Sequence, residues 1–97
     1  MFKQPSRSAD RFFTLLAQSS SRGPRLGLAI SKKQVRRAVD RNRLKRLARE
    51  VFRIYRSQLA CVDVVIMARQ AATVADNASL RRSLERHLRQ AAGLVID

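Results

Sequence analysis

The chain has 97 residues, enough for about one small domain, and its 45% hydrophobic content argues against a wholly disordered protein. A net charge of +14, from 21 basic and 7 acidic residues, favours a polyanionic partner, first a nucleic acid and then an anionic membrane surface. There is no apolar run of about 18 residues and no signal-peptide core, and the single cysteine, Cys61, indicates a reduced thiol in a cytoplasmic protein.

The first third of the chain predicts two short strands after an irregular lead-in. Residues 1–11 are polar and show no period, whereas residues 12–17 form a short apolar run with two phenylalanines, which is typical of a strand. Residues 25–31 form a second such run after a turn that contains Gly23 and Pro24. We expect these two strands to pair as a hairpin.

A basic connection at 32–37 leads to a long amphipathic helix at about 38–56. Within this helix, apolar side chains recur at i, i+3, i+4, i+7 and i+11, which is the spacing of one helical face. We expect this face to pack on the sheet, and its members are Leu44, Leu47, Ala48, Val51 and Tyr55.

The last third of the chain predicts a central strand and a second helix. Residues 62–68 are almost continuously apolar, as in a strand that is at least partly covered on both faces. A loose connection at 71–78 follows, and Asn77 or Ser79 is a candidate cap of the helix after it. Gly93 is a candidate stop for the last helix.

Together these elements predict a single α+β domain over residues 1–97. Their order is strand, strand, helix, strand, helix. A small mixed sheet of three or four strands is expected to be packed by the long basic helix and the C-terminal helix. No repeat, linker or second domain is evident in the sequence.

The long helix is also the most basic part of the chain. At about 100° per residue, six polar or basic side chains fall between about 100° and 200° from Leu44, away from the centre of the apolar face. Glu50 is spaced to pair with Arg46 and Arg53. A charged face is usually only solvated, but the excess of arginine here favours contact with a phosphate backbone. The six are Asn42, Lys45, Arg46, Arg49, Arg53 and Arg56, while Arg41 and Arg43 project to two other sides.

Two stretches of the sequence resemble the bacterial ribonuclease P protein subunit. They are RLGLAISKK at 25–33 and AVDRNRLKRLARE at 38–50, in which RNR at 41–43 matches the signature helix of that family. The strand at 62–68 and the last amphipathic helix also fit, so the resemblance covers nearly the whole chain. The family's usual first helix, which ends near an aromatic residue like Phe2, has no counterpart in this sequence.

The resemblance implies a small protein that joins a large catalytic RNA to remove the 5′ leader from precursor tRNA. The RNA would hydrolyse the phosphodiester bond with bound Mg²⁺, so the endoribonuclease P activity belongs to an RNA–protein holoenzyme and the protein holds no catalytic residue. The signature helix and the loop before it would bind the catalytic RNA, and a cleft between that helix and one sheet face would hold the single-stranded leader. The resemblance also implies a left-handed crossover between parallel strands, against the general rule, and no membrane or obligate protein partner.

The resemblance assigns residues of this chain to both binding functions. Alternation along the first strand places Phe12, Thr14 and Leu16 on one face. Phe12 has core packing as its alternative role, and Arg69 has the alternative of an exposed arginine at a strand end. The RNA-binding set is Lys32, Lys33, Arg36, Arg37, Arg41, Asn42, Arg43, Lys45, Arg46, Arg49 and Arg53, and the leader-cleft set is Phe2, Phe12, Thr14, Leu16 and Arg69.

Other kinds of chemistry have little support in the residues. His87 is the only histidine and is expected to be a surface or packing residue, and no histidine–cysteine cluster has zinc-site spacing. Asp40 and Asn42 are candidates for outer-sphere contact with a metal near RNA, but one carboxylate is too few for a metal site in the protein alone. The alternative functions are a structural RNA-binding protein of ribosomal type and a protein that binds anionic membranes or double-stranded DNA.

Overall fold

The computed structural model describes residues 6–19, 24–59 and 62–96. Its strands form one four-stranded sheet in the order β1-β2-β4-β3, and the predicted α+β class is confirmed. The elements are β1 (Ser6–Ala9), β2 (Phe13–Ser19), β3 (Arg25–Ala29), α1 (Ala38–Tyr55), the 3-10 helix η1 (Arg56–Gln58), β4 (Val62–Ala68), the 3-10 helix η2 (Gln70–Val74) and α2 (Asn77–Ile96).

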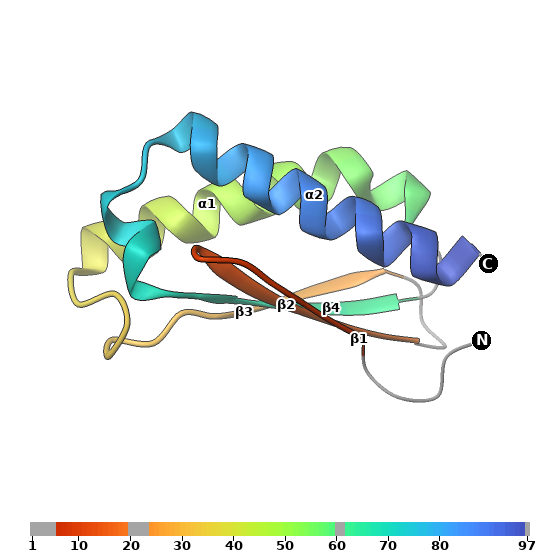
Figure 1. Cartoon of the computed structure of the whole chain (residues 1–97), viewed down its shortest axis with the longest axis horizontal. Helices are drawn as coiled ribbons and strands as arrows, with labels where there is room; N and C mark the ends of the chain where they lie inside the picture. The colour runs from red at the N-terminus through yellow and green to blue at the C-terminus, as the bar shows by residue number, and fades with distance from the viewer. Residues whose placement is uncertain (1–5, 20–23, 60–61, 97) are drawn as a thin grey trace.

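Both helices lie on the same face of the sheet, which gives the protein two layers (Figure 1). α1 packs beside α2 and against β3, whereas α2 lies over β1 and β2. β4 pairs with β2 in the antiparallel sense and with β3 in the parallel sense, so the sheet is mixed as expected. The left-handed sense of the β3–α1–β4 connection stays a prediction.

The expected hairpin between the second and third strands does not form. β4 lies between β2 and β3, so these two strands do not pair with each other. Burial of β4 explains this strand order. β4 is the most continuously apolar strand, and its central position covers both of its edges and most of its side chains. The prediction for 62–68 as a central strand is confirmed.

The lead-in is not irregular throughout, because Ser6–Ala9 forms the edge strand β1. It pairs with β2 in the antiparallel sense, with Ser8 opposite Leu15 and Ala9 opposite Thr14. A strand of four residues, SRSA, has no apolar alternation to reveal it, and it is recognised only by its backbone pairing with β2. Sequence patterning therefore missed it.

The core lies between the sheet and the two helices. All five residues of the predicted apolar face of α1 are buried, and the alternation along β2 is confirmed because Phe13, Leu15 and Ala17 are almost fully covered. These residues meet the buried side of β4 and the leucines of α2. The members contributed by β4 and α2 are Val62, Val64, Ile66, Ala68, Leu80, Leu84, Leu88 and Ala91.

Both expectations about the ends of the last helix are wrong. The cap is Asp76, whose Oδ1 accepts a hydrogen bond from the backbone N–H of Ser79 at 3.3 Å, so neither Asn77 nor Ser79 is the capping residue. The helix also continues through Gly93 to Ile96. A glycine within a helix costs only about 1 kcal/mol relative to alanine, which is too little to end a helix by itself.

Candidate nucleic-acid interface

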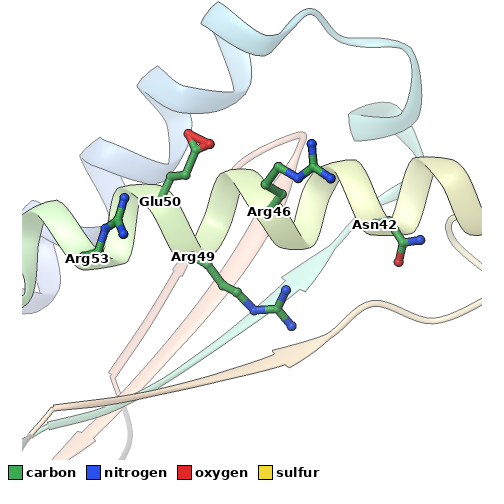
Figure 2. A pocket seen from close by; sticks show the side chains of 5 residues that line it. All are labelled: Asn42, Arg46, Arg49, Glu50 and Arg53. Carbon is green, nitrogen blue, oxygen red and sulfur yellow. The ribbon is translucent and has the colours of Figure 1, made fainter.

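The solvent-facing side of α1 carries a row of unpaired arginines. Arg46, Arg49 and Arg53, which we call the arginine row, are exposed, and with Asn42 and Glu50 they line an open depression of about 400 Å³ (Figure 2). None of the three guanidinium groups forms a hydrogen bond or an ion pair with another described residue. The predicted basic face therefore exists, and its donors are available to a ligand.

Glu50 does not pair with the arginine row. Its Oε1 atom accepts a hydrogen bond from Nη2 of Arg81 on α2, at 3.0 Å, instead of pairing with Arg46 or Arg53 as the sequence spacing suggested. The two helices pack side by side, which brings Arg81 within reach. Because this pair is exposed, it contributes little stability, and its effect is to draw the one carboxylate of the depression toward α2.

Arg41 and Arg43 behave differently from the arginine row. Nη1 of Arg41 donates to the backbone oxygens of Val35 at 3.0 Å and Arg36 at 2.7 Å. Arg43 donates to a separate segment, around η2 and the start of α2. Its acceptors are the oxygens of Ala72 at 3.4 Å, Thr73 at 3.1 Å and Ala75 at 3.3 Å, and Oδ1 of Asn77 at 2.7 Å.

The basic loop, residues 31–37, is ordered despite its lack of periodicity. Val35 is fully buried and its N–H donates to the oxygen of Ser31 at 3.0 Å, while Oε1 of Gln34 accepts from the N–H of Gln70 at 3.0 Å. Four exposed basic side chains surround this anchor. They are Lys32, Lys33, Arg36 and Arg37.

Few carboxylates offset the charge of this surface. Within the part of the chain that the structure describes, the only ion pair of the predicted RNA-binding set joins Arg37 and Asp40, whose Nε and Oδ2 atoms are 3.8 Å apart. Across residues 6–19, 24–59 and 62–96, no group of three histidine, cysteine or acidic side chains forms a potential metal site. The contact of Asp40 and Asn42 with a metal near RNA stays a prediction, and the net field of this surface is strongly positive.

The opposite face of the sheet carries the predicted leader-cleft residues. Thr14 and Leu16 point away from the helices, and Arg69 donates from Nε to Oγ1 of Thr14 at 3.3 Å. The backbone N–H of Arg69 also donates to the oxygen of Phe12 at 2.8 Å. The space between α1 and the sheet is filled by the core, so a cleft lined by these residues is the open sheet face and does not lie between the helix and the sheet.

Phe12 is half-buried at the margin of the core, and the guanidinium carbon of Arg11 lies 5.7 Å from the centroid of its ring. Phe12 therefore packs partly on the core and is partly exposed at the sheet edge, so its position does not choose between the two roles. Phe2, the remaining leader-cleft residue, lies outside the described residues, as does Cys61.

Asp10 forms a polar cluster that the sequence did not reveal. Its Oδ1 accepts from the N–H groups of Phe12 at 2.8 Å and Phe13 at 2.9 Å, and its Oδ2 accepts from Ser83 at 2.5 Å and Arg86 at 2.6 Å. Burial raises the pKa of the Asp10 carboxyl, but the hydrogen bonds from Ser83, Phe13, Phe12 and Arg86 together lower the pKa far below its ordinary value. The carboxylate thus ties the β1–β2 turn to α2.

His87 completes this cluster and is a packing residue. It is only 1% exposed, its Nδ1 lies 2.5 Å from Oγ of Ser8, and its Nε2 lies 3.2 Å from Oδ2 of Asp10. Burial lowers the pKa of His87 more than the nearby Asp10 raises it, which favours the neutral form of the ring. Serine, histidine and aspartate also make nucleophilic triads, but this ring is closed off from solvent and Ser8 donates its hydroxyl hydrogen to Gln90.

Within the described segments, neither helix combines the length and apolar content needed to cross a membrane. The polar face of α1 carries arginines along its whole length, and α2 has arginines at Arg81, Arg82, Arg86 and Arg89.

Comparison with known proteins gives one consistent result. A family model described as Ribonuclease P matches residues 1–92. The ribonuclease P protein component of Methylococcus capsulatus is 52% identical over a region that covers 90% of this chain and 69% of that protein. The corresponding protein of Escherichia coli is 43% identical, with 96% of this chain and 82% of that protein covered.

Solved structures agree with the sequence matches. The RNase P protein of Staphylococcus aureus superposes with a TM-score of 0.81 at 32% identity and covers 90% of this chain and 81% of its own. The RNase P protein of Thermotoga maritima superposes with a TM-score of 0.77 at 26% identity, covering 91% and 84%. The similarity therefore spans nearly the whole chain and is not confined to the arginine-rich helix.

Proposed function

Because this chain belongs to the ribonuclease P protein family, we propose that it is the protein subunit of a ribonuclease P holoenzyme and takes part in tRNA processing. In this proposal it binds the catalytic RNA and the 5′ leader of precursor tRNA, and it assists the endonucleolytic cut that produces the mature 5′ end. Hydrolysis is carried out by the RNA subunit, with Mg²⁺ held by the RNA and the substrate. The holoenzyme works in the cytoplasm.

The observation that supports RNA binding most directly is the unpaired arginine row. From Asn42 to Arg53, α1 advances by about 16 Å, since each helical residue adds about 1.5 Å. Over that length Arg46, Arg49 and Arg53 present guanidinium groups that no described carboxylate neutralises. Guanidinium groups form paired hydrogen bonds with phosphate oxygens, so a row of them suits a ribose–phosphate strand.

The basic loop extends this surface at the N-terminal end of α1. Lys33, Arg36 and Arg37 line a second depression of about 270 Å³, together with Gln70 and Val74 on the η2 side. Charge on the loop and charge on α1 therefore act on the same RNA partner, which we propose to be the catalytic RNA. We propose that the RNA-binding set named in the sequence analysis makes this contact with the catalytic RNA.

The open sheet face is the proposed site of the leader. Half-buried Leu16 of β2 and Met67 of β4 form part of its floor, Arg69 and Phe12 lie at one end, and Thr14, which lies opposite Met67, is only 6% exposed. No helix among the described residues covers this face. Unpaired bases stack on exposed apolar and aromatic surfaces, with a contribution of about 1–3 kcal/mol per base at aromatic side chains. A single-stranded leader suits such a surface better than a duplex does.

The experiment that tests the function adds the purified protein to its cognate RNase P RNA at low magnesium and measures cleavage of a 5′-extended tRNA. We expect cleavage by the RNA to rise several-fold and the protein alone to leave the substrate intact. Tight RNA binding without any stimulation would instead support the structural RNA-binding alternative. Cleavage by the protein alone would contradict the assignment of hydrolysis to the RNA.

A further inference from the structure

Three consecutive residues of α1, Arg41, Asn42 and Arg43, have different surroundings. Asn42 is exposed and lines the depression with the arginine row, whereas Arg41 and Arg43 are half-buried and donate to backbone oxygens of other segments. The resemblance to the ribonuclease P protein family assigns all three to the RNA-binding set. The hydrogen bonds separate them.

Arg43 holds the segment that joins β4 to α2. Its Nη1 and Nη2 atoms reach three backbone oxygens, those of Ala72, Thr73 and Ala75, and Nη1 also reaches Oδ1 of Asn77. Backbone oxygens near the end of a helical turn lack partners within the turn, and a cation is favourable there. Removing the guanidinium group would leave these acceptors to solvent and release η2.

Arg41 does the same for the basic loop. Its Nη1 atom donates to the oxygens of Val35 and Arg36, the two residues at the centre of the loop. Gln34 in this loop accepts from the N–H of Gln70, the first residue of η2. The two arginines therefore hold two segments that are also hydrogen-bonded to each other, and those segments form the walls of the depression with Lys33, Arg36 and Arg37.

We propose that Arg41 and Arg43 are positioning residues, which order the basic loop and η2 before RNA arrives and do not themselves contact phosphate. This inference rests on the proposed function, because it concerns how the same surface binds the catalytic RNA. Side chains that are already ordered lose less entropy on binding, so a preorganised loop binds more tightly than a mobile one with the same charge.

The positive charges of Arg41 and Arg43 are not neutralised by these hydrogen bonds, because the acceptors are uncharged carbonyl and amide oxygens. An arginine-to-lysine change therefore preserves the electrostatic field of the surface but removes the guanidinium group, whose Nη1 and Nη2 atoms reach four acceptors at Arg43 and whose Nη1 atom reaches two at Arg41. At Arg46, which has no partner among the described residues, the same change keeps the charge and breaks no contact within the protein. The lysine series separates positioning from charge.

The first measurement is amide hydrogen exchange on the protein without RNA. We expect Arg43→Lys to accelerate exchange at least about tenfold at residues 70–77, and Arg41→Lys to do so at residues 31–37, where Val35 N–H and Gln34 N–H are protected by Ser31. Core amides of α1 serve as the internal reference for global opening. Arg46→Lys is the matched control, and its exchange is expected to equal that of the unaltered protein in both segments.

The second measurement is affinity for the cognate RNase P RNA over a range of salt concentrations, at a temperature where circular dichroism shows each variant folded. We expect Arg41→Lys and Arg43→Lys to weaken binding about five- to tenfold with an unchanged salt slope, because ordering cost rises while the phosphate contacts stay the same. Arg46→Ala is expected to reduce the salt slope by about one unit. If Arg41→Lys and Arg43→Lys only lowered the free energy of unfolding, the RNA affinity measured on the folded variants would be unchanged.

Two results would overturn the positioning role. One is unchanged exchange in both segments of the Arg41→Lys and Arg43→Lys variants. The other is full RNA affinity in those variants together with a reduced salt slope in Arg41→Ala and Arg43→Ala, which would make them phosphate contacts. If Arg46→Ala changes neither affinity nor slope, the proposed contact face fails, whereas the exchange result still decides the positioning role.

Discussion

Arg46, Arg49 and Arg53 on α1 extend into solvent without a carboxylate partner, whereas Arg86 on α2 is paired with Asp10 in a cluster that also includes Ser83 and His87. Both regions contain charged side chains, and in both the arginines belong to an amphipathic helix. In the cluster, each charge is matched by donors or acceptors of the protein itself. On the arginine row it is not, so that region depends on an external anion for neutralisation. This difference separates charge that the protein itself satisfies from charge that we propose to bind RNA.

Replacing Asp10 by alanine is expected to have the largest effect on folding. The carboxylate accepts four hydrogen bonds, from Phe12, Phe13, Ser83 and Arg86, and all four donors would lose it. We expect a loss of about 2–4 kcal/mol in the free energy of unfolding, measured by urea denaturation. Arg46→Ala is the control and should change that free energy by less than about 0.5 kcal/mol. Equal effects of the two changes would remove the distinction between the regions.

Acid should lower the free energy of unfolding through the Asp10–His87 cluster, whereas the arginines of the arginine row keep their charge. The pKa of His87 is lowered in the folded protein, so as the pH falls the unfolded chain takes up a proton before the folded protein does. The contribution of His87 to the free energy of unfolding is therefore complete above pH 6.5 and is lost as the pH falls below it. The slope approaches about 1.4 kcal/mol per pH unit at most for one such group. The pKa of Asp10 is also lowered, so a second loss follows as the pH falls below 3.8.

His87 is the only histidine, so His87→Gln gives a direct test of the first loss. Urea denaturation between pH 7.5 and 5 should show a pH-dependent free energy of unfolding for the unaltered protein and a flatter one for the variant. The same pH dependence in both proteins would mean that another group is responsible.

Removing Glu50 is expected to have the smallest effect. Its ion pair with Arg81 is exposed at both ends, so Glu50→Gln should change the free energy of unfolding by less than about 0.5 kcal/mol. The variant also removes the only carboxylate of the depression on α1, and RNA affinity at low salt should rise slightly. Filter binding at two salt concentrations measures this, and a weakened complex would show that Glu50 has a positive role in RNA binding.

Sequence patterning predicted the parts of the molecule in which local period and burial agree. The helical repeat of Leu44, Leu47 and Val51 located both the buried and the basic face of α1, and the apolar run at 62–68 located the central strand. Patterning failed where long-range contacts decide. β4 separates the two strands that were expected to form a hairpin, and backbone pairing makes a strand of Ser6–Ala9.

The candidate site shows the same limit. Helical geometry placed Arg46, Arg49 and Arg53 on one exposed face and Arg41 and Arg43 on two other sides, but it could not show that the latter two donate to backbone oxygens of other segments. Asp10 and His87 meet across the whole length of the chain, so no local spacing signals their contact. Residue type and period predicted where charge lies, and tertiary contacts determine which charges are already satisfied.

The salt dependence of RNA binding tests the central claim most directly. Arg46 and Arg49 are replaced together by alanine, and a charge-matched variant replaces Arg82 and Arg89 on α2, so that both lose two positive charges. Because Arg89 also donates from Nε to the hydroxyl of Tyr55 at 3.2 Å, circular dichroism checks that the second variant is folded. If the arginine row lies on phosphates, the first variant should lower the slope of log affinity against log salt by about two units and the second by much less. Equal slopes for both variants would show that only net charge matters and would contradict the assignment of α1 as the RNA-binding face.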